Sequence, residues 1–342
     1  MKLSFSPYTL QLRYPFALAT GTRTTTPAIL VQIHHENLIG YGEASLPPYL
    51  EESAEEAILF LSKLKIEKFN PLNIAEILKY VDEVEVGHNA AKASIDIALH
   101  DLVGKILNKP CYEMLGIEPI NIPYSSYTIS IDAKEVIKEK LEKFNQFKIL
   151  KIKLGKGNDK ELITTVKSFS NKIFSVDANQ GWIDKHYALD MAYWLKEQGA
   201  LFIEQPFSKN NFEDTAWLTE KSPLPIIADE SIKRLEDVKK AKGVFHGINI
   251  KLMKSTGIHE ALKMIALARE LNLKIMIGCM TETSCAVSAA AQLAPLADWC
   301  DLDGVYLINN DPFSGNKVKE DGEIVLGEWP GLGIASFNSI SN

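Results

Sequence analysis

The stretch Phe147–Gly157, FKILKIKLGKG, places two lysines, Lys151 and Lys153, on one predicted β-strand. Alternate side chains of a strand share a face, so we expect both ammonium groups to point into whatever the strand lines. Two partly buried lysines side by side lower each other's pKa, and a lysine with a lowered pKa can act as a general base near neutral pH. The alternative is that one lysine faces solvent, or that both lie on an edge strand.

On both sides of this stretch the chain alternates short apolar strands with amphipathic helical segments, from about residue 120 to residue 308. The apolar segments are ILKIKL, IFSVDA, LFIEQP, LPIIADE, GINIKL, KIMIGCM and WCDLDGV. Such alternation predicts parallel β/α architecture, either a barrel or a doubly wound sheet. The sequence has neither a Gly-x-Gly-x-x-Gly motif after a first strand nor a Walker A motif, which argues against a nucleotide-binding sheet.

One polar residue stands at the end of each of these strands, at intervals of 22 to 28 residues. These residues are Lys153, Asp177, Glu204, Asp229, Lys251, Cys279 and Asp301. The interval matches one strand, one helix and two short loops. In a (β/α)₈ barrel the carboxyl ends of the strands face one mouth, where active sites lie, so we expect these side chains to form a ring.

Three carboxylates of this ring, Asp177, Glu204 and Asp229, come from three adjacent strands. Their charges would repel one another without a cation, and an all-oxygen set of ligands suits Mg²⁺, one ion per subunit. Lys251 is expected on the far side of the metal from Lys151 and Lys153. A base on each face of a metal-bound substrate is the arrangement that epimerisation or racemisation requires.

The N-terminal part has a different pattern, which predicts a separate α+β module. Residues 1–45 are predicted to form an antiparallel meander, followed by helices up to residue 108. A polar loop is expected over residues 19–26, and it carries one cation, Arg23. We expect a capping domain over residues 1–115, a barrel over residues 116–308, and a C-terminal segment over residues 309–342 that packs back on the capping domain.

Composition narrows the class of protein. The net charge is −7 and the isoelectric point about 5.6, and the lysines are scattered, which argues against nucleic acid as a partner. No stretch has the length and apolarity of a membrane span or a signal peptide. The four cysteines show neither metal-ligand nor disulfide-framework spacing, so we expect a cytoplasmic protein. The sequence leaves the oligomeric state open, a homo-oligomer included.

Taken together, the Lys-x-Lys pair, the Asp-Glu-Asp set and Lys251 resemble the enolase superfamily, within it the muconate-lactonizing subgroup. The resemblance covers almost the whole chain. It implies a modified TIM barrel with an N-terminal α+β capping domain completed by the C-terminal tail. It also implies proton transfer at a carbon beside a carboxylate through an ene-diolate, with Lys153 and Lys251 as the two bases and Lys151 beside the substrate carboxylate.

Within that subgroup, Asp301-Leu302-Asp303 resembles the motif with which dipeptide epimerases hold the substrate's α-ammonium group. Two aspartates on one face of a strand call for a cationic group on the ligand. The same resemblance places Thr128 and Cys279 against the dipeptide. It also pairs Arg23 with the side-chain carboxylate of the second residue.

The resemblance therefore implies a dipeptide epimerase that inverts the α-carbon of the C-terminal residue. The substrate is L-Ala-L/D-Glu or a hydrophobic or broader range of dipeptides. The alternatives on the same scaffold are an o-succinylbenzoate synthase, a muconate cycloisomerase and an N-acylamino acid racemase.

Overall fold

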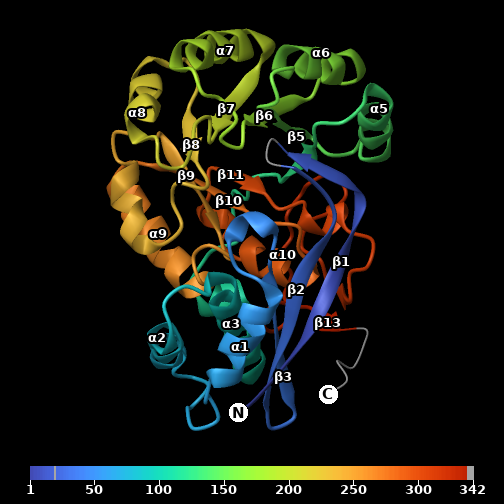
Figure 1. Cartoon of the computed structure of the whole chain (residues 1–342). Helices are drawn as coiled ribbons and strands as arrows, with labels where there is room; N and C mark the ends of the chain where they lie inside the picture. The colour runs from blue at the N-terminus through green and yellow to red at the C-terminus, as the bar shows by residue number, and fades with distance from the viewer. Residues whose placement is uncertain (19–20, 337–342) are drawn as a thin grey trace.

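The N-terminal part of the chain is a three-stranded antiparallel sheet packed against helices (Figure 1). The computed structural model describes residues 1–18 and 21–336. The strands are β1 (Lys2–Leu18), β2 (Gly21–His35) and β3 (Leu38–Ser45), in the order β1-β2-β3. The long β1–β2 ribbon runs from the foot of this part up to the barrel (Figure 1).

The polar segment that carries Arg23 is a strand and not the loop that the sequence predicts. β2 already begins at Gly21, and Arg23 pairs with Phe16 of β1. The threonine-rich run suits a strand because β-branched residues pack well on a pleated surface. Residues 19 and 20 of the expected loop lie outside the described residues.

The helices of this part are η1 (Pro48–Leu50), α1 (Ala54–Lys63), α2 (Ile74–Val84), α3 (Asn89–Leu107) and α4 (Cys111–Met114). α1 and α3 pack on the sheet, and α2 and α4 pack against α3. Helix α3 is buried along most of its length. It approaches β3 closely because Gly40 and Gly42 lack side chains, and a Cβ atom at Gly42 would lie 1.9 Å from the Ser94 carbonyl oxygen.

The second part is an eight-stranded parallel sheet that curls into a nearly closed barrel. Its strands are β4 (Ser126–Ile129), β5 (Ile149–Lys153), β6 (Ile173–Asp177), β7 (Ala200–Glu204), β8 (Ile226–Ala228), β9 (Gly247–Lys251), β10 (Lys274–Gly278) and β11 (Trp299–Asp301). They follow one another in chain order, and a bridge between Ser125 and Cys300 joins the two outer strands. The predicted fold class, a (β/α) barrel with an α+β cap, is confirmed.

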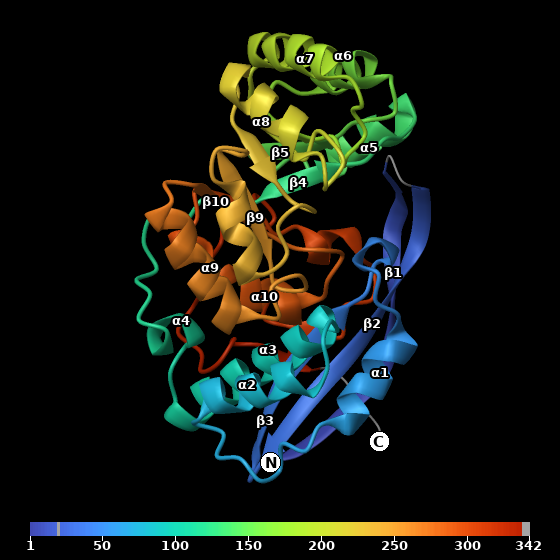
Figure 2. The same ribbon diagram turned by 60° about the vertical axis from the view of Figure 1, so that its left-hand side comes forward.

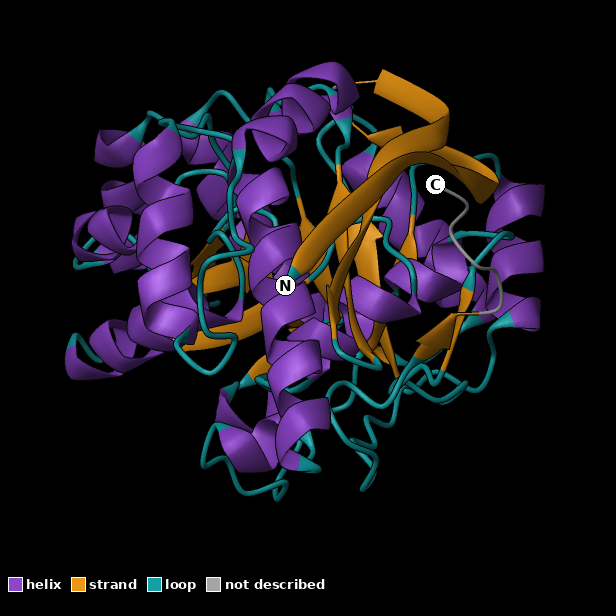
Figure 3. Cartoon of the chain, turned by 90° about the horizontal axis from the view of Figure 1, so that it is seen from below, coloured by secondary structure: helices purple, strands orange, loops and turns teal. Residues whose placement is uncertain are grey.

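Helices cover the outside of the barrel (Figures 2 and 3). They are α5 (Lys134–Lys143), α6 (Asp159–Phe169), α7 (Lys185–Gln198), α8 (Phe212–Lys221), η2 (Leu235–Ala241), α9 (Ile258–Glu270), α10 (Ser284–Ala291) and η3 (Ala294–Leu296). The short η4 (Gly304–Leu307), after β11, packs against β1 instead. The barrel departs from a regular one after β8 and β11, where 3₁₀ turns replace α-helices. No helix within residues 1–18 and 21–336 combines the length and apolarity needed to cross a membrane.

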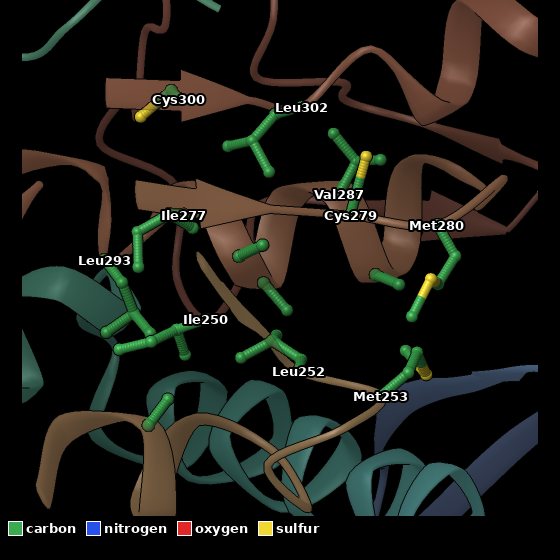
Figure 4. Close-up of a cluster of buried hydrophobic side chains, with 14 of the residues drawn as sticks. Ile250, Leu252, Met253, Ile277, Cys279, Met280, Val287, Leu293, Cys300 and Leu302 are labelled. Carbon is green, nitrogen blue, oxygen red and sulfur yellow. The ribbon is translucent and has the colours of Figure 1, made fainter. Parts of the chain in front are cut away.

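Side chains alternate between the two faces of the barrel strands. On β9, Ile250 belongs to the buried apolar cluster, as does Leu252 just after the strand (Figure 4). Asn249 and Lys251 point the other way, into the barrel, where Asn249 donates to Glu204 of β7 and Lys251 to Asp229 just after β8. The strands therefore present an apolar outer face. The interior is polar at the carboxyl ends of the strands, and deeper in the barrel Phe202, Ile227 and Met276 form a separate apolar cluster.

The C-terminal segment contacts both parts of the molecule. It contains two short paired strands, β12 (Phe313–Ser314) and β13 (Ala335–Ser336). The Asn309 amide donates to the Gln11 carbonyl of β1, and the Ser125 amide donates to the Gly322 carbonyl. The exact domain limits remain predictions.

Candidate active site

Three carboxylates converge at the carboxyl ends of β6, β7 and β8. Asp177 and Glu204 are register partners on neighbouring strands, and Asp229 follows β8 directly. One oxygen from each lies within 4.8 Å of the others, and all three residues are buried. The spacing argument from the sequence predicts this convergence.

The donor set fits a hard divalent cation. It consists of carboxylate oxygens alone, which suits Mg²⁺. Glu204 Oε2 is buried and lies 2.7 Å from Lys151 Nζ, but it accepts no well-aligned hydrogen bond from the residues that the structure describes. The Asn249 amide donates to Glu204 Oε1 at 2.8 Å and orients the group. A Cβ atom at Gly278 would lie 2.5 Å from Asn249 Oδ1, so this glycine leaves the space that Asn249 occupies.

Lys151 lies at the centre of these charges and is almost fully buried. Its ammonium group lies 2.8 Å from Asp301 and 3.3 Å from Asp177, besides the contact with Glu204. Burial alone would lower the pKa of Lys151, but the neighbouring carboxylates outweigh burial and hold this pKa well above its usual value. The sequence predicts a lowered pKa for Lys151, and the carboxylates around its ammonium group have the opposite effect.

Lys153 and Lys251 reach the site from opposite walls of the barrel. β5 and β9 are four strands apart in an eight-stranded ring, so they face each other across the mouth. Lys153 Nζ lies 2.7 Å from Asp177, and Lys251 Nζ lies 2.7 Å from Asp229. Burial lowers the pKa of Lys251, but the Asp229 carboxylate more than offsets this effect and raises it well above its usual value.

A further buried lysine, Lys254, forms an ion pair with Asp229. Its ammonium group donates to Asp229 Oδ1 at 2.6 Å and to the backbone carbonyls of Asn249 and Ile232 at 3.0 and 3.1 Å. Burial lowers the pKa of Lys254. Lys254 could not be predicted from the sequence because it lies beyond the end of β9, where the alternation of a strand no longer determines side-chain direction.

Asp301 and Asp303 both line the pocket at the barrel mouth. Asp301 ends β11 and accepts from Ser126 Oγ at 2.8 Å and from Lys151. Asp303 lies beyond the strand, so alternation does not determine its direction. Its carboxylate accepts from the Thr128 backbone amide at 2.6 Å, and burial and Asp301 raise the pKa of Asp303 to about 7.

Thr128, Cys279 and Arg23 also line this pocket. Arg23 reaches it from the capping domain, with its guanidinium carbon 5.1 Å from the Phe16 ring centre and 5.6 Å from that of Tyr49. Within residues 1–18 and 21–336, no carboxylate lies at ion-pair distance from Arg23. The structure thus brings every site residue expected from the sequence to one place.

Several residues of the same pocket were not predicted. They are Phe16, Tyr49, Asn179, Gln180, Glu230, Met280, Thr281 and Leu307. Asn179 and Gln180 have positive φ angles of 42° and 66°, a backbone conformation that few non-glycine residues adopt. Burial and Asp229 raise the pKa of Glu230 to about 7. The sequence signal for Asn179 and Glu230 was their position one or two residues after a predicted metal ligand.

The chain matches two family models over most of its length. Residues 132–337 match the model described as enolase C-terminal domain-like. Residues 4–116 match the N-terminal domain model of mandelate racemase and muconate lactonizing enzyme.

Individual relatives cover the chain almost completely. An L-Ala-D/L-Glu epimerase of Bacteroides thetaiotaomicron is 52% identical over 98% of this chain and 88% of the relative. An L-Ala-D/L-amino acid epimerase of Pedosphaera parvula is 37% identical over 92% of this chain and 93% of the relative. The solved structure of a dipeptide epimerase from Enterococcus faecalis, complexed with Mg and L-Leu-L-Tyr, superposes with a TM-score of 0.90. It is 31% identical, over 98% of this chain and 99% of that structure.

Proposed function

The chain belongs to the mandelate racemase and muconate lactonizing enzyme family of the enolase superfamily, and from this we infer that it is a Mg²⁺-dependent dipeptide epimerase. It is an isomerase that inverts the α-carbon of the C-terminal residue of a dipeptide. The observation that carries this function is the pair of lysines, Lys153 and Lys251, on opposite walls of a barrel with three carboxylates between them.

Asp177, Glu204 and Asp229 would hold the metal ion. When bound, Mg²⁺ supplies positive charge that stabilises the negative charge developing on the substrate carboxylate. Lys151 would lie beside the same carboxylate and add a fixed positive charge. Asp177 and Asp229, which contact the Lys153 and Lys251 ammonium groups at 2.7 Å, would then bind the ion, and both amines would be free to turn toward the substrate.

Lys153 and Lys251 would then act as the two bases. One takes the α-proton from one face of the substrate carbon, and the other delivers a proton to the opposite face. The roles exchange for the opposite epimer. This requires both amines within reach of a single carbon, which placement on facing strands supports.

Asp301 and Asp303 would bind the α-ammonium group of the dipeptide. Two carboxylates at one end of the pocket favour a cation there. The carboxylate end of the substrate then lies toward the metal ligands. The charges of the pocket therefore match those of a dipeptide, with anionic groups for its amino terminus and cationic groups for its carboxyl terminus.

The position of Arg23 favours a dipeptide substrate whose second residue has an acidic side chain, as in L-Ala-L/D-Glu. Its guanidinium lines the pocket and has no carboxylate partner among the described residues, so a ligand carboxylate would complete it. The aromatic rings of Phe16 and Tyr49 restrict its movement. The same rings, with Met280, would favour a hydrophobic side chain if Arg23 turned aside.

The test is a comparison of kcat/KM for L-Ala-L-Glu and the nearly isosteric L-Ala-L-Gln, by chiral separation of the products. We expect a preference for L-Ala-L-Glu of roughly 10-fold or more, the value of a hydrogen bond to a charged group. The Arg23→Met variant should lose this preference, whereas Arg269→Met, which removes an arginine paired with Asp298 on the outer surface, should keep it. Equal use of the two dipeptides by the wild type would overturn the acidic specificity, and a preference for L-Ala-L-Leu would assign the site to hydrophobic dipeptides.

We also propose that the enzyme works in the cytoplasm. All four cysteines, Cys111, Cys279, Cys285 and Cys300, are buried free thiols, which suits a reducing compartment. A small dipeptide is the partner that the pocket accommodates, and a homo-oligomer stays a prediction.

A further inference from the structure

Two buried threonines link the capping domain to the loop that follows β10. Thr26 of β2 is fully buried and Thr281 is 2% exposed, and their hydroxyl oxygens lie 2.8 Å apart. Arg23 Nε donates to Thr26 Oγ1 at 3.1 Å. Thr281 also lines the pocket beside Arg23.

The direction of the bond between the two hydroxyls follows from counting hydrogens. Each hydroxyl has one hydrogen to donate and two lone pairs to accept with. Among the described residues, the Thr26 hydroxyl has no acceptor other than Thr281, and a buried donor without an acceptor costs stability. Thr26 therefore accepts from Arg23 and donates to Thr281.

This assignment leaves the hydroxyl hydrogen of Thr281 without an acceptor in the part of the chain that the structure describes. The other group near it, Arg23 Nη2 at 3.5 Å, is itself a donor. The free hydrogen and the guanidinium thus lie side by side at the pocket wall, and both require an acceptor from the ligand.

The backbone around Thr281 is fixed by the capping domain. Ser45 Oγ donates to the Thr281 carbonyl at 2.7 Å. The Thr283 amide donates to the buried Glu43 carboxylate at 3.0 Å. Because both neighbours come from β3, the hydroxyl of Thr281 keeps its place relative to Arg23 of the adjacent strand β2.

We propose that Thr281 is a specificity-determining residue whose hydroxyl donates to the side-chain carboxylate of the C-terminal residue, beside the Arg23 guanidinium. This inference rests on the proposed acidic specificity. Arg23, Thr26 and Thr281 form one directed chain, in which each hydrogen bond polarises the next and strengthens the last donor. The ligand oxygen completes the chain.

The experiment compares the ratio of kcat/KM for L-Ala-L-Glu to that for L-Ala-L-Leu in the holoenzyme and its variants. Thr281→Val keeps the shape of the side chain and removes the hydroxyl, and it should lower the ratio roughly 10- to 100-fold, the range for a hydrogen bond to a charged group. Thr281→Ser, which restores a hydroxyl, should recover most of the ratio. An unchanged ratio in Thr281→Val overturns the proposal.

The Arg23→Met background separates direct contact from an effect through Arg23. If Thr281 touches the carboxylate, Thr281→Val lowers the ratio further in that background. If it has no further effect there, Thr281 only positions Arg23 and the direct contact is wrong. A wild type without preference for the acidic dipeptide overturns the proposed specificity and the Thr281 role together, whereas a preference as strong in Thr281→Val as in the wild type overturns the Thr281 role alone.

Discussion

Replacing Lys151 by methionine tests how the charges of the metal-free site are balanced. The ammonium group lies 2.7 Å from Glu204, 2.8 Å from Asp301 and 3.3 Å from Asp177. Lys151→Met keeps most of the volume of the side chain and leaves these carboxylates without their shared cation. Breaking a buried ion pair from one side costs about 3–5 kcal/mol, so we expect a loss of stability of that size in EDTA.

The same variant should bind Mg²⁺ more tightly. Two unit charges 4 Å apart interact by about 4 kcal/mol at an effective dielectric constant of about 20, so removing the repulsion between the ammonium group and the ion should raise affinity at least about tenfold. Added Mg²⁺ should then recover more stability in Lys151→Met than in the wild type. Activity should nevertheless be lost, since the fixed charge beside the substrate carboxylate is missing.

Urea and thermal unfolding in EDTA measure the loss of stability of Lys151→Met, and calorimetric titration measures its affinity for Mg²⁺. With about 2–4 °C lost per kcal/mol, the melting temperature in EDTA should fall on the order of 10 °C. Lys156→Met, at an exposed position just after the same strand, is the matched control and should behave as the wild type. Two results would contradict this prediction. One is a free energy of unfolding in EDTA that differs by less than about 1 kcal/mol between Lys151→Met and the wild type, and the other is weaker Mg²⁺ binding by Lys151→Met than by the wild type.

Three further predictions concern the two bases, the ammonium site and pH. Lys153→Ala and Lys251→Ala should each abolish net inversion, while each retains exchange of the α-proton of one epimer with deuterated water; wild-type inversion in either variant contradicts the two-base mechanism. Asp303→Asn should raise KM for a free-amine dipeptide roughly 10-fold or more relative to its N-acetylated form, as loss of a charged hydrogen bond implies, and an equal change in both KM values would remove the ammonium role. Burial raises the pKa of Glu43 to about 7 and that of Glu282 to about 8. The folded protein therefore holds protons that the unfolded chain releases near pH 4.5, and the associated stability is present below that pH and lost as pH rises through 7 to 8. Between pH 6 and pH 9 the free energy of unfolding, measured in urea, should fall by about 1–3 kcal/mol less in Glu282→Gln than in the wild type. An equal fall in both proteins would contradict the raised pKa of Glu282.

The barrel and its ring of polar residues could be predicted because they depend on local properties of the chain. Strands of three to five residues and helical segments of seven to fourteen residues set the interval between strand ends, and β5, β6, β7 and β9 end at Lys153, Asp177, Glu204 and Lys251. Alternation then directs these side chains inward. Neither step requires knowledge of tertiary contacts.

The remaining features depend on contacts between distant segments. Arg23 lies on a strand because β1 supplies a pairing partner for a polar run that resembles a loop by composition. Asp303 and Lys254 lie beyond strand ends, where hydrogen bonds from Thr128 and to Asp229 determine their directions. The pKa of Lys151 depends on how many carboxylates contact its ammonium group. The spacing of the acidic residues along the sequence does not give this number.

Inversion of a dipeptide by proton exchange at one α-carbon would introduce hydrogen from the solvent at that carbon, so isotope uptake measures the proposed reaction itself. L,L-dipeptide libraries would be incubated with the enzyme and Mg²⁺ in deuterated water and analysed by mass spectrometry. We predict that one deuteron enters the C-terminal residue, first in L-Ala-L-Glu, and that Lys153→Ala/Lys251→Ala shows none. Absence of uptake from every dipeptide with the wild-type enzyme would contradict the account.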